Sequence, residues 1–490
     1  MSVIEDRTHK YLEEIENINP FENNKSIRDI DMAQWFGELI EDVIAFNIDD
    51  NQFWYYNGRC WVLDKGKKEI ECQADYFGNA INEYCHRLRK SLTPKGQKPP
   101  KELDDYIKSI NRLGSYKNRM TLIKDVQHHI GVKYEDFDSN KYLINCQNGT
   151  YDIQNKVFRK HDSKDFITRM TPIVYDPDAI SDDWDRFIHE VMEDDQLKVN
   201  YLQKLFGYCL TGSTTEGQMY ILYGKSTRNG KSTMTETISY ILGNNNGYSA
   251  NAQPDLIAKK KVDSRRPSED VARLKGVRAV FIGEPDKGMV LNCAMVKQLV
   301  GEDMVTARKM YGHDFEFKPE CKLIMHTNHL PEFYDQSLIY GNKIVVISFN
   351  RHFSEDEQDH TLKDRLRSEY NVAGIFNWML KGLEMYQSEG LKQPDSIRCD
   401  TKEYGSVSDT VGNFINEMLT EKDGATANGT EVYITYKKYC QSNGLTASSN
   451  RIFYNDLKSH GIIIDEGKVN GSYCRNRING YMIENSLYLD

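Results

Sequence analysis

The sequence lacks a long hydrophobic run, and this absence limits what the chain can be. Its 490 residues contain no stretch of about 18 apolar residues, so we expect no membrane-spanning helix and no membrane partner. The first residues, MSVIEDRTHKYLEEIE, are acidic and lack the apolar region of a signal peptide. The ten cysteines form no C-x-x-C pair, which disfavours structural zinc and a disulfide framework. A cytoplasmic protein with reduced thiols is therefore predicted.

An overall excess of positive charge is also missing. The net charge of −10 argues against a protein that simply coats nucleic acid. Basic residues nevertheless gather in two stretches: residues 85–133 hold twelve Lys and Arg against four Asp and Glu, and residues 259–278 hold eight against three. Such stretches favour contact with a polyanion at defined places, although ordinary solvated surface gives the same pattern.

The segment 220–241, YILYGKSTRNGKSTMTETISYI, resembles a phosphate-binding loop. A short apolar strand runs into a Gly-containing turn and then into a segment with helical spacing, so backbone N–H groups and a helix N-terminus would face an anion. Lys231 would reach the β- and γ-phosphates of ATP, and the Ser232 hydroxyl would ligate Mg²⁺. Further nucleotide-binding residues are expected at Gly224, Ser226, Asn229, Gly230 and Thr233.

The spacing of this loop departs from the usual G-x-x-x-x-G-K-[ST] pattern. Gly224 lies one residue further from Gly230 than the pattern requires, so we expect a loop that is one residue longer. The alternative interpretation is a helix N-terminus that happens to carry a surface lysine.

Four apolar runs predict a mostly parallel sheet in an α/β domain with helices on both faces: Met219–Tyr223, Val277–Ile282, Lys322–His326 and Ile344–Phe349. Glu284 follows the second run, where a carboxylate could hold Mg²⁺ or polarise the attacking water, with Asp286 as a secondary candidate. Asn328 follows the third run and could bond the γ-phosphate, although a simple turn residue fits there too.

Between the second and third apolar runs, residues 305–317 (VTARKMYGHDFEF) predict a β-hairpin. Arg308, Lys309 and His313 lie on or near its turn and could grip the phosphates of a DNA strand. Ordinary surface charge on an exposed hairpin explains them equally simply.

The remaining chain predicts three further regions. Residues 1–170 suggest an N-terminal α+β domain with a hairpin at 53–63, turning at Asn57-Gly58, and another at 142–153, turning at Asn148-Gly149. Residues 171–218 suggest a linker with a helical collar before the ATPase region 219–395. Residues 405–490 predict three helices followed by a β-hairpin, which is the pattern of a winged helix. The alternative is a module that contacts another subunit. DNA contacts would come from the candidate recognition helix (Asn450, Arg451, Asn455, Lys458) and the candidate wing (Tyr473, Arg475, Arg477).

Several ordered motifs resemble the superfamily 3 helicases of phages, plasmids and pathogenicity islands. The motifs are LYGKSTRNGKST, VFIGEPDKG, LNCAMVKQLVGEDMVTARKMYGHDFEFKP and MHTNHLP, and the resemblance extends over roughly residues 140–490. It implies an AAA+-like core, a hexameric ring with ATP between subunits, 3′ to 5′ unwinding, and a hairpin that contacts single-stranded DNA. Family roles fall on Lys231, Ser232, Glu284 and Asn328. Members often carry a primase domain; residues 1–140 show no evident primase motif, and a separate primase is a possible partner.

One position departs from the family pattern. Relatives usually place arginines just before the strand that here reads KIVVISF, and one of them acts as a finger in the neighbouring subunit's site. This chain has Gly341-Asn342-Lys343 there, so Lys343 or the later Arg351 is the candidate. Lysine and arginine differ in geometry and hydration, so the two candidates are not equivalent and the finger assignment stays open.

The sequence therefore predicts a replicative helicase and origin-binding initiator of a mobile genetic element. A DNA-translocating or packaging ATPase is the enzyme alternative. An origin-recognition protein that binds ATP without acting as a motor is the non-enzyme alternative.

Overall fold

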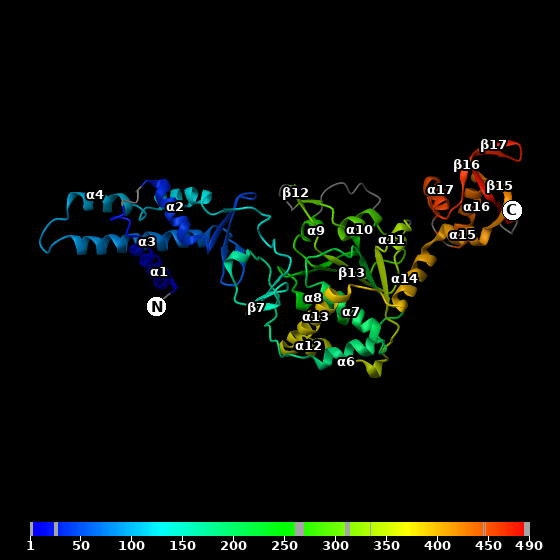
Figure 1. Cartoon of the computed structure of the whole chain (residues 1–490), viewed down its shortest axis with the longest axis horizontal. Helices are drawn as coiled ribbons and strands as arrows, with labels where there is room; N and C mark the ends of the chain where they lie inside the picture. Colours follow the sequence, from blue (N-terminus) through cyan, green and yellow to red (C-terminus); the bar gives the residue numbers. More distant parts are fainter. Residues whose placement is uncertain are drawn as a thin grey trace. The chain divides into compact units, whose positions relative to one another are not determined.

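The structure is a computed structural model, and it describes residues 3–23, 28–259, 269–308, 314–333, 335–443, 445 and 447–484. The chain forms two compact units, Met1–Tyr175 and Asp176–Asp490. The boundary between them lies inside the linker predicted at 171–218. Figure 1 shows the course of the chain and labels many of its helices and strands.

The first unit mixes helices with two small sheets. Its helices are α1 (Val3–Ile18), α2 (Asp29–Ile40), α3 (Lys68–Leu92), α4 (Lys101–Ile110) and α5 (Tyr116–Asp125). Its strands are β1 (Ile44–Asn47), β2 (Gln52–Tyr56), β3 (Trp61–Leu63), β4 (Gly131–Val132), β5 (Leu143–Cys146), β6 (Gly149–Asp152) and β7 (Val157–Arg159). The sheets have the orders β3-β2-β1-β4 and β5-β6-β7.

The core of this unit forms around α3. Ile70, Ala74, Phe77 and Ile81 recur at helical spacing and are fully buried, so one face of the helix packs inward. The Phe36 ring of α2 stacks on the Phe77 ring with centroids 5.0 Å apart. Side chains of α1, α4 and α5 complete the same core.

Both predicted hairpins of this unit are present, but one turn is shifted. β2 and β3 pair around Asn57-Gly58, where Gly58 has a φ of 91°, as predicted. In the second hairpin the turn falls on Gln147-Asn148, so the prediction of Asn148-Gly149 was wrong by one residue. Gly149 belongs to β6, and a Cβ there would lie 2.5 Å from the Arg159 carbonyl oxygen of β7. This glycine therefore serves close strand packing rather than the turn.

The second unit contains an α/β domain followed by a smaller C-terminal module. The helices of the domain are α6 (Asp182–Val191), α7 (Gln196–Tyr208), α8 (Lys231–Leu242), α9 (Glu269–Ala272), α10 (Cys293–Val300), α11 (Ser337–Tyr340), α12 (Leu362–Leu366), α13 (Glu369–Glu389) and α14 (Asp395–Ser408). Its strands are β8 (Met219–Tyr223), β9 (Ser249–Ala252), β10 (Ala279–Ile282), β11 (Val305–Arg308), β12 (Asp314–Phe317), β13 (Lys322–Thr327) and β14 (Ile344–Ser348).

The predicted parallel sheet is confirmed, with strand order β14-β8-β13-β10-β9 and every pairing parallel. Met219 and Ile221 of β8 join the core on one face, to which α10 contributes, while Tyr220 and Leu222 are fully buried on the other. Burial on both faces explains why these strands read as continuous apolar runs. The edge strand β9 was not predicted, because its sequence SANA has no apolar run.

Buried cations tie the collar helix α7 to the sheet. Lys322, at the start of β13, donates hydrogen bonds to the carbonyls of Thr211 and Ser213, just beyond the end of α7. Arg278, just before β10, donates to the Leu210 carbonyl. Carbonyl groups at a helix C-terminus favour positive charge, so these cations satisfy groups that would otherwise be buried without partners.

The strands of the predicted hairpin at 305–317 are confirmed as β11 and β12, which pair antiparallel up to Arg308 and Asp314. The turn residues between them lie outside the described residues, and so do Lys309 and His313.

The C-terminal module follows the predicted order of helices and hairpin and adds one strand. Its elements are α15 (Thr410–Met418), β15 (Leu419–Asn428), α16 (Gly429–Ser442), α17 (Asn450–Ser459), β16 (Ile464–Val469) and β17 (Ser472–Ile483). They form a three-stranded sheet with the order β15-β17-β16. β15 was not predicted, since the sequence LTEKDGATAN shows no alternating apolar pattern.

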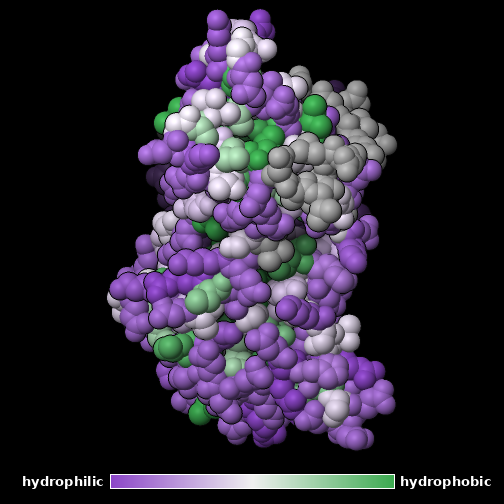
Figure 2. All heavy atoms as spheres, turned by 90° about the vertical axis from the view of Figure 1, so that its right-hand side faces the viewer, coloured by the Kyte–Doolittle hydropathy of each residue, from purple (hydrophilic) through white to green (hydrophobic). Residues whose placement is uncertain are grey.

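Among the described residues, no helix is long and apolar enough to cross a membrane. The face shown in Figure 2 is largely hydrophilic, and its hydrophobic residues lie in small separate groups.

Candidate nucleotide-binding site

Three predicted site residues meet at one edge of the parallel sheet. Lys231 follows β8, Glu284 follows β10 and Asn328 follows β13, and the carboxyl ends of parallel strands share an edge. Lys231 Nζ donates a hydrogen bond to Asn328 Oδ1 at 2.8 Å. The backbone N–H and the Nδ2 of Asn328 donate to the two carboxylate oxygens of Glu284 at 3.1 and 3.3 Å. Lys231, Asn328 and Glu284 therefore form one connected polar network.

The Lys231 ammonium is buried among oxygen atoms of the protein. Its side chain is buried, and burial lowers the pKa of Lys231 to about 8, against the opposing charge of Glu284. Nζ also donates to Asn229 Oδ1 at 2.9 Å and to the Gly224 carbonyl at 3.5 Å. These protein oxygens satisfy the ammonium, because a charge in a low-dielectric site needs oxygen partners.

The two glycines of the loop are required for different reasons. A Cβ on Gly224 would lie 2.2 Å from Asn229 Nδ2 and 2.7 Å from the Phe349 carbonyl oxygen, so only glycine permits this close approach. Gly230 has a φ of 82°, and a Cβ there would lie 2.5 Å from Val191 Cγ2 of α6. The sequence predicted both positions, but not the packing against α6.

The longer loop is held by the segment that follows β14, residues 352–355. Arg228 adopts a left-handed backbone with a φ of 59°, and its carbonyl accepts a hydrogen bond from the Phe353 N–H at 2.9 Å. The Thr227 carbonyl accepts from His352 Nδ1 at 2.9 Å, and Arg228 pairs with Glu355 at 3.3 Å. The 352–355 segment thus anchors the middle of the loop from outside.

The loop offers oxygen donors that suit Mg²⁺. Ser232 lies exposed in the first turn of α8, and the Glu284 carboxylate is exposed at the same sheet edge. Magnesium is usually held by one or two protein oxygens together with substrate phosphates and water, so this donor set fits the ion. Ser226 contributes its carbonyl to the loop, accepting from Asn229 Nδ2 at 2.6 Å.

A cavity of about 560 Å³ adjoins the phosphate loop and was not predicted. Phe187 and Glu190 of α6 line it on one side, Arg228 and Gly230 on another, and Phe353 begins the segment 353–365 that completes it. Its size falls within the range of small-ligand sites. The sequence of this last segment, FSEDEQDHTLKDR, carries no motif that would have revealed the cavity.

The two finger candidates lie at opposite edges of the sheet. Lys343 precedes β14, whose Ile344 aligns with Met219 at the start of β8, so it stands at the edge away from the phosphate loop. Arg351 follows β14 near the loop and pairs with Glu357 at 2.5 Å. A residue that acts in a neighbouring subunit must lie away from its own loop, and this favours Lys343. Its role stays a prediction.

The structure places some of the predicted DNA-contact residues. Arg308 ends β11, 3.8 Å from the Asp314 carboxylate across the hairpin. The basic stretch 259–278 is described only in part, because residues 260–268 lie outside the described chain. On the candidate recognition helix α17, Asn450, Arg451, Asn455 and Lys458 are exposed.

The candidate wing residues on β17 differ in their contacts. Arg475 is exposed, whereas Arg477 makes a two-pronged ion pair with Asp465 at 2.9 and 2.8 Å. The Tyr473 hydroxyl donates to Glu466 at 2.5 Å. Of these cations, Arg477 already has its charge balanced within the module.

Three known families match successive parts of the chain. The family described as D5 N terminal like matches residues 33–193, a family of unknown function (DUF5906) matches 222–338, and the family described as Poxvirus D5 protein-like matches 406–484. The resemblance predicted from the motifs, to the superfamily 3 primase-helicase group, is confirmed.

The similar curated proteins come from large DNA viruses rather than from phages or plasmids. A protein of Acanthamoeba polyphaga mimivirus named "Putative helicase L207/L206" is 26% identical over 73% of this chain and 40% of its own length. One of Invertebrate iridescent virus 3, "Putative helicase 121R", is 22% identical over 79% and 47%. An African swine fever virus protein, "Putative primase C962R", is 21% identical over 63% and 34%. The chain thus spans less than half the length of these relatives.

Solved structures of the NrS-1 C-terminal region cover 91% of this chain and 99% of their own, with 11% identity and TM-scores of 0.46 and 0.47.

The anchoring of the loop by the 352–355 segment gives a first prediction. We expect His352→Ala to weaken binding of an ATP analogue about two- to tenfold, since one hydrogen bond to the loop contributes about 0.5–1.5 kcal/mol. Glu355→Gln should change the affinity by less than about twofold, because the ion pair between Glu355 and Arg228 is exposed to solvent. Titration of a fluorescent ATP analogue measures both.

Asp356→Ala serves as the control, since Asp356 is exposed in the same turn and no hydrogen bond or ion pair joins it to the described loop residues. An unchanged dissociation constant for His352→Ala, with an unchanged melting temperature, would show that the segment does not position the loop.

Proposed function

We propose that the chain is an ATP-dependent DNA helicase that opens duplex DNA at the replication origin or fork of a viral or other mobile genome. The observation that carries the proposal is the Lys231–Asn328–Glu284 network at the carboxyl edge of a parallel sheet, directly beside a phosphate-type loop. The helicase-named relatives support the same activity.

Each residue of the network has a role in hydrolysis. Lys231 would exchange its bonds to Asn229 and Asn328 for the β- and γ-phosphates of ATP. Glu284 would accept a proton as water attacks the γ-phosphorus and the bond to the β-phosphate oxygen breaks, releasing ADP and phosphate. Asn328, freed from Lys231, would orient the γ-phosphate. Bound Mg²⁺, held by Ser232 and Glu284, would neutralise charge on the phosphates.

The ring arrangement rests on the family resemblance. We propose a hexamer in which Lys343 reaches the neighbouring subunit's nucleotide, and in which the β11–β12 hairpin, with Arg308, Lys309 and His313, contacts single-stranded DNA. Movement would run 3′ to 5′. The placement of Lys343 at the sheet edge away from its own loop supports this arrangement.

The C-terminal module is proposed to bind duplex DNA as a winged helix. The order helix–strand–helix–helix–strand–strand around a three-stranded sheet supports this assignment. Arg451, Asn455 and Lys458 recur at helical spacing on α17, so they share an exposed face that could enter the major groove. Arg475 would meet the phosphate backbone from the wing.

Substitutions in the network provide the central test. Lys231→Ala should lose ATP binding, ATP hydrolysis and strand separation together. Glu284→Gln should still bind ATP but hydrolyse it about 10²–10⁴-fold more slowly, because the proton acceptor is lost. ATPase and unwinding assays on forked DNA with 3′ or 5′ single strands measure these effects, and Asp286→Asn tests the secondary carboxylate candidate in the same assays.

The outcomes separate the alternatives. DNA-stimulated hydrolysis without strand separation would identify a translocating or packaging ATPase. ATP binding without any hydrolysis in the wild-type chain would contradict the motor and leave an ATP-binding origin-recognition protein.

The lowered pKa of Lys231 predicts a pH dependence of ATP binding. Above about pH 8 the ligand-free lysine is neutral, so binding must take up a proton and becomes weaker. We expect the dissociation constant to rise roughly tenfold between pH 7.5 and 9.0. Lys231→Arg, which keeps its charge, should flatten this dependence. Equal wild-type affinities at the two pH values would argue against a buried ammonium as the phosphate ligand.

Removing the exposed side chains of α17 tests the C-terminal module. The triple change Arg451→Ala, Asn455→Ala, Lys458→Ala should lower affinity for duplex DNA and reduce the salt slope by about 0.9 for each phosphate that is no longer neutralised. Lys422→Ala with Lys437→Ala is the control, since these two lysines are exposed on β15 and α16. Unchanged DNA affinity with a changed oligomer mass would assign α17 to subunit contact instead.

A further inference from the structure

The connection between α3 and α4 concentrates positive charge without a single acid. Residues 89–101, RKSLTPKGQKPPK, carry Arg89, Lys90, Lys95, Lys98 and Lys101 and no Asp or Glu, and all five cations are exposed. We call residues 89–101 the basic tip. In Figure 1 the α3–α4 connection forms the left-hand end of the first unit.

Ion pairing separates the basic tip from the rest of the basic stretch 85–133. Away from the tip, most cations of the stretch have carboxylate partners within the unit: Arg87 with Glu16 and Glu83, Lys108 with Asp104, Arg112 with Asp29, Arg119 with Asp75, and Lys133 with Glu135. The exceptions among the described residues are Lys117 and Lys124 on α5. Arg89 at the tip's edge pairs with Asp104 as well. Within the described chain, no carboxylate pairs with Lys90, Lys95, Lys98 or Lys101.

The backbone of the basic tip is ordered by turns. The Gln97 N–H bonds the Pro94 carbonyl at 3.0 Å, and Gly96 adopts a φ of 85°, which closes the turn. Pro94, Pro99 and Pro100 restrict the chain further. Leu103, buried in the core at the start of α4, fixes the end of the tip. The backbone that carries the lysines is therefore held at both ends and in its turn, so less backbone entropy is lost when the tip binds a ligand.

The chemistry of the basic tip fits a nucleic-acid backbone. Clustered ammonium groups repel one another, and a polyanion removes that repulsion while releasing its own counterions. Lysine is a point charge that contacts phosphates without reading bases. A protein partner fits less well, because protein interfaces are enriched in aromatic side chains and depleted of lysine, and the tip has no aromatic residue.

We propose that the basic tip is a sequence-independent contact for the phosphate backbone of DNA. The choice of DNA as the polyanion rests on the proposed helicase function. The four lysines without partners are the contacting groups, and the tip adds affinity without adding sequence preference.

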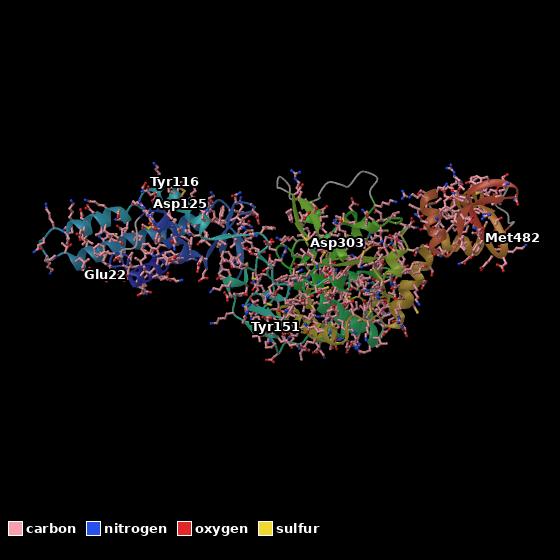
Figure 3. All side chains as sticks on the ribbon, turned by 45° about the horizontal axis from the view of Figure 1, so that its top comes forward. Glu22, Tyr116, Asp125, Tyr151, Asp303 and Met482 are labelled. Carbon is pink, nitrogen blue, oxygen red and sulfur yellow. The ribbon has the colours of Figure 1, made fainter. Side chains whose placement is uncertain are left out.

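The test replaces the charge of the tip and compares it with the same change elsewhere on the unit. The tip variant carries Lys90→Gln, Lys95→Gln, Lys98→Gln and Lys101→Gln. The control carries Lys65→Gln, Lys68→Gln, Lys117→Gln and Lys124→Gln, which are exposed positions off the tip. Two of these lie on α5, whose ends Tyr116 and Asp125 are labelled in Figure 3, back from the tip.

Binding of a fluorescein-labelled random-sequence duplex and of a 30-nucleotide single strand is measured by anisotropy at several salt concentrations. For the tip variant we expect the salt slope on duplex to fall by about 0.9 for each phosphate that is no longer neutralised, hence by roughly 2–4, and by about 0.7 each on the single strand. Affinity at low salt should fall tenfold or more. The control should keep the wild-type slope, and both variants should keep the wild-type melting temperature and the ATPase rate measured without DNA.

An unchanged slope in the tip variant, or an equal decrease in the control, would overturn the proposal. Equally tight, tip-dependent binding of poly-glutamate would reassign the tip to an acidic protein partner and overturn it as well. The proposed function fails separately: a wild-type chain without ATPase activity that still binds DNA through the tip leaves the tip assignment standing. Conversely, normal unwinding together with DNA binding that does not depend on the tip would contradict the tip assignment and leave the proposed function standing.

Discussion

The parallel arrangement of five strands is the constraint on which the candidate site depends. Because every strand of this sheet runs the same way, the residues after β8, β10 and β13 must reach one edge. Lys231, Glu284 and Asn328 are far apart in sequence, yet this topology makes them neighbours in one hydrogen-bonded network. The same arrangement sends Lys343 to the opposite edge, away from the Lys231–Asn328–Glu284 network.

The phosphate loop shows how a departure from a consensus can be absorbed locally. An added residue would leave the loop free to shift if nothing else held it. Here the left-handed backbone of Arg228 takes up the extra length, and the 352–355 segment bonds the carbonyls of Thr227 and Arg228. Gly224 and Gly230 keep their places because neighbouring atoms exclude a Cβ at both positions. The Lys231 ammonium therefore keeps its hydrogen bonds to Asn229 and Asn328 despite the longer spacing.

Sequence reasoning succeeded where one local signal was enough. Burial on both faces is shared by strands β8, β10, β13 and β14. Strands of this kind have continuous apolar sequences, so their apolar runs predicted them. The polar residue after each strand then follows from topology. Reasoning failed for β9 and β15, whose sequences SANA and LTEKDGATAN become strands only because a neighbouring strand supplies hydrogen-bond partners. It also missed the cavity lined by α6 and Phe353, since that wall joins segments far apart in the chain.

Charge is the property that sequence counting described least well. The stretch 85–133 has a clear excess of cations, but tertiary ion pairs to residues as distant as Glu16 and Asp29 neutralise several of them. Four of the cations left without a carboxylate partner among the described residues belong to the basic tip. The wing of the C-terminal module shows the same difference between cations: Arg477 pairs with Asp465, whereas Arg475 is exposed. A surface able to hold a polyanion is therefore defined by which cations the fold leaves unpaired, and only the folded chain determines that.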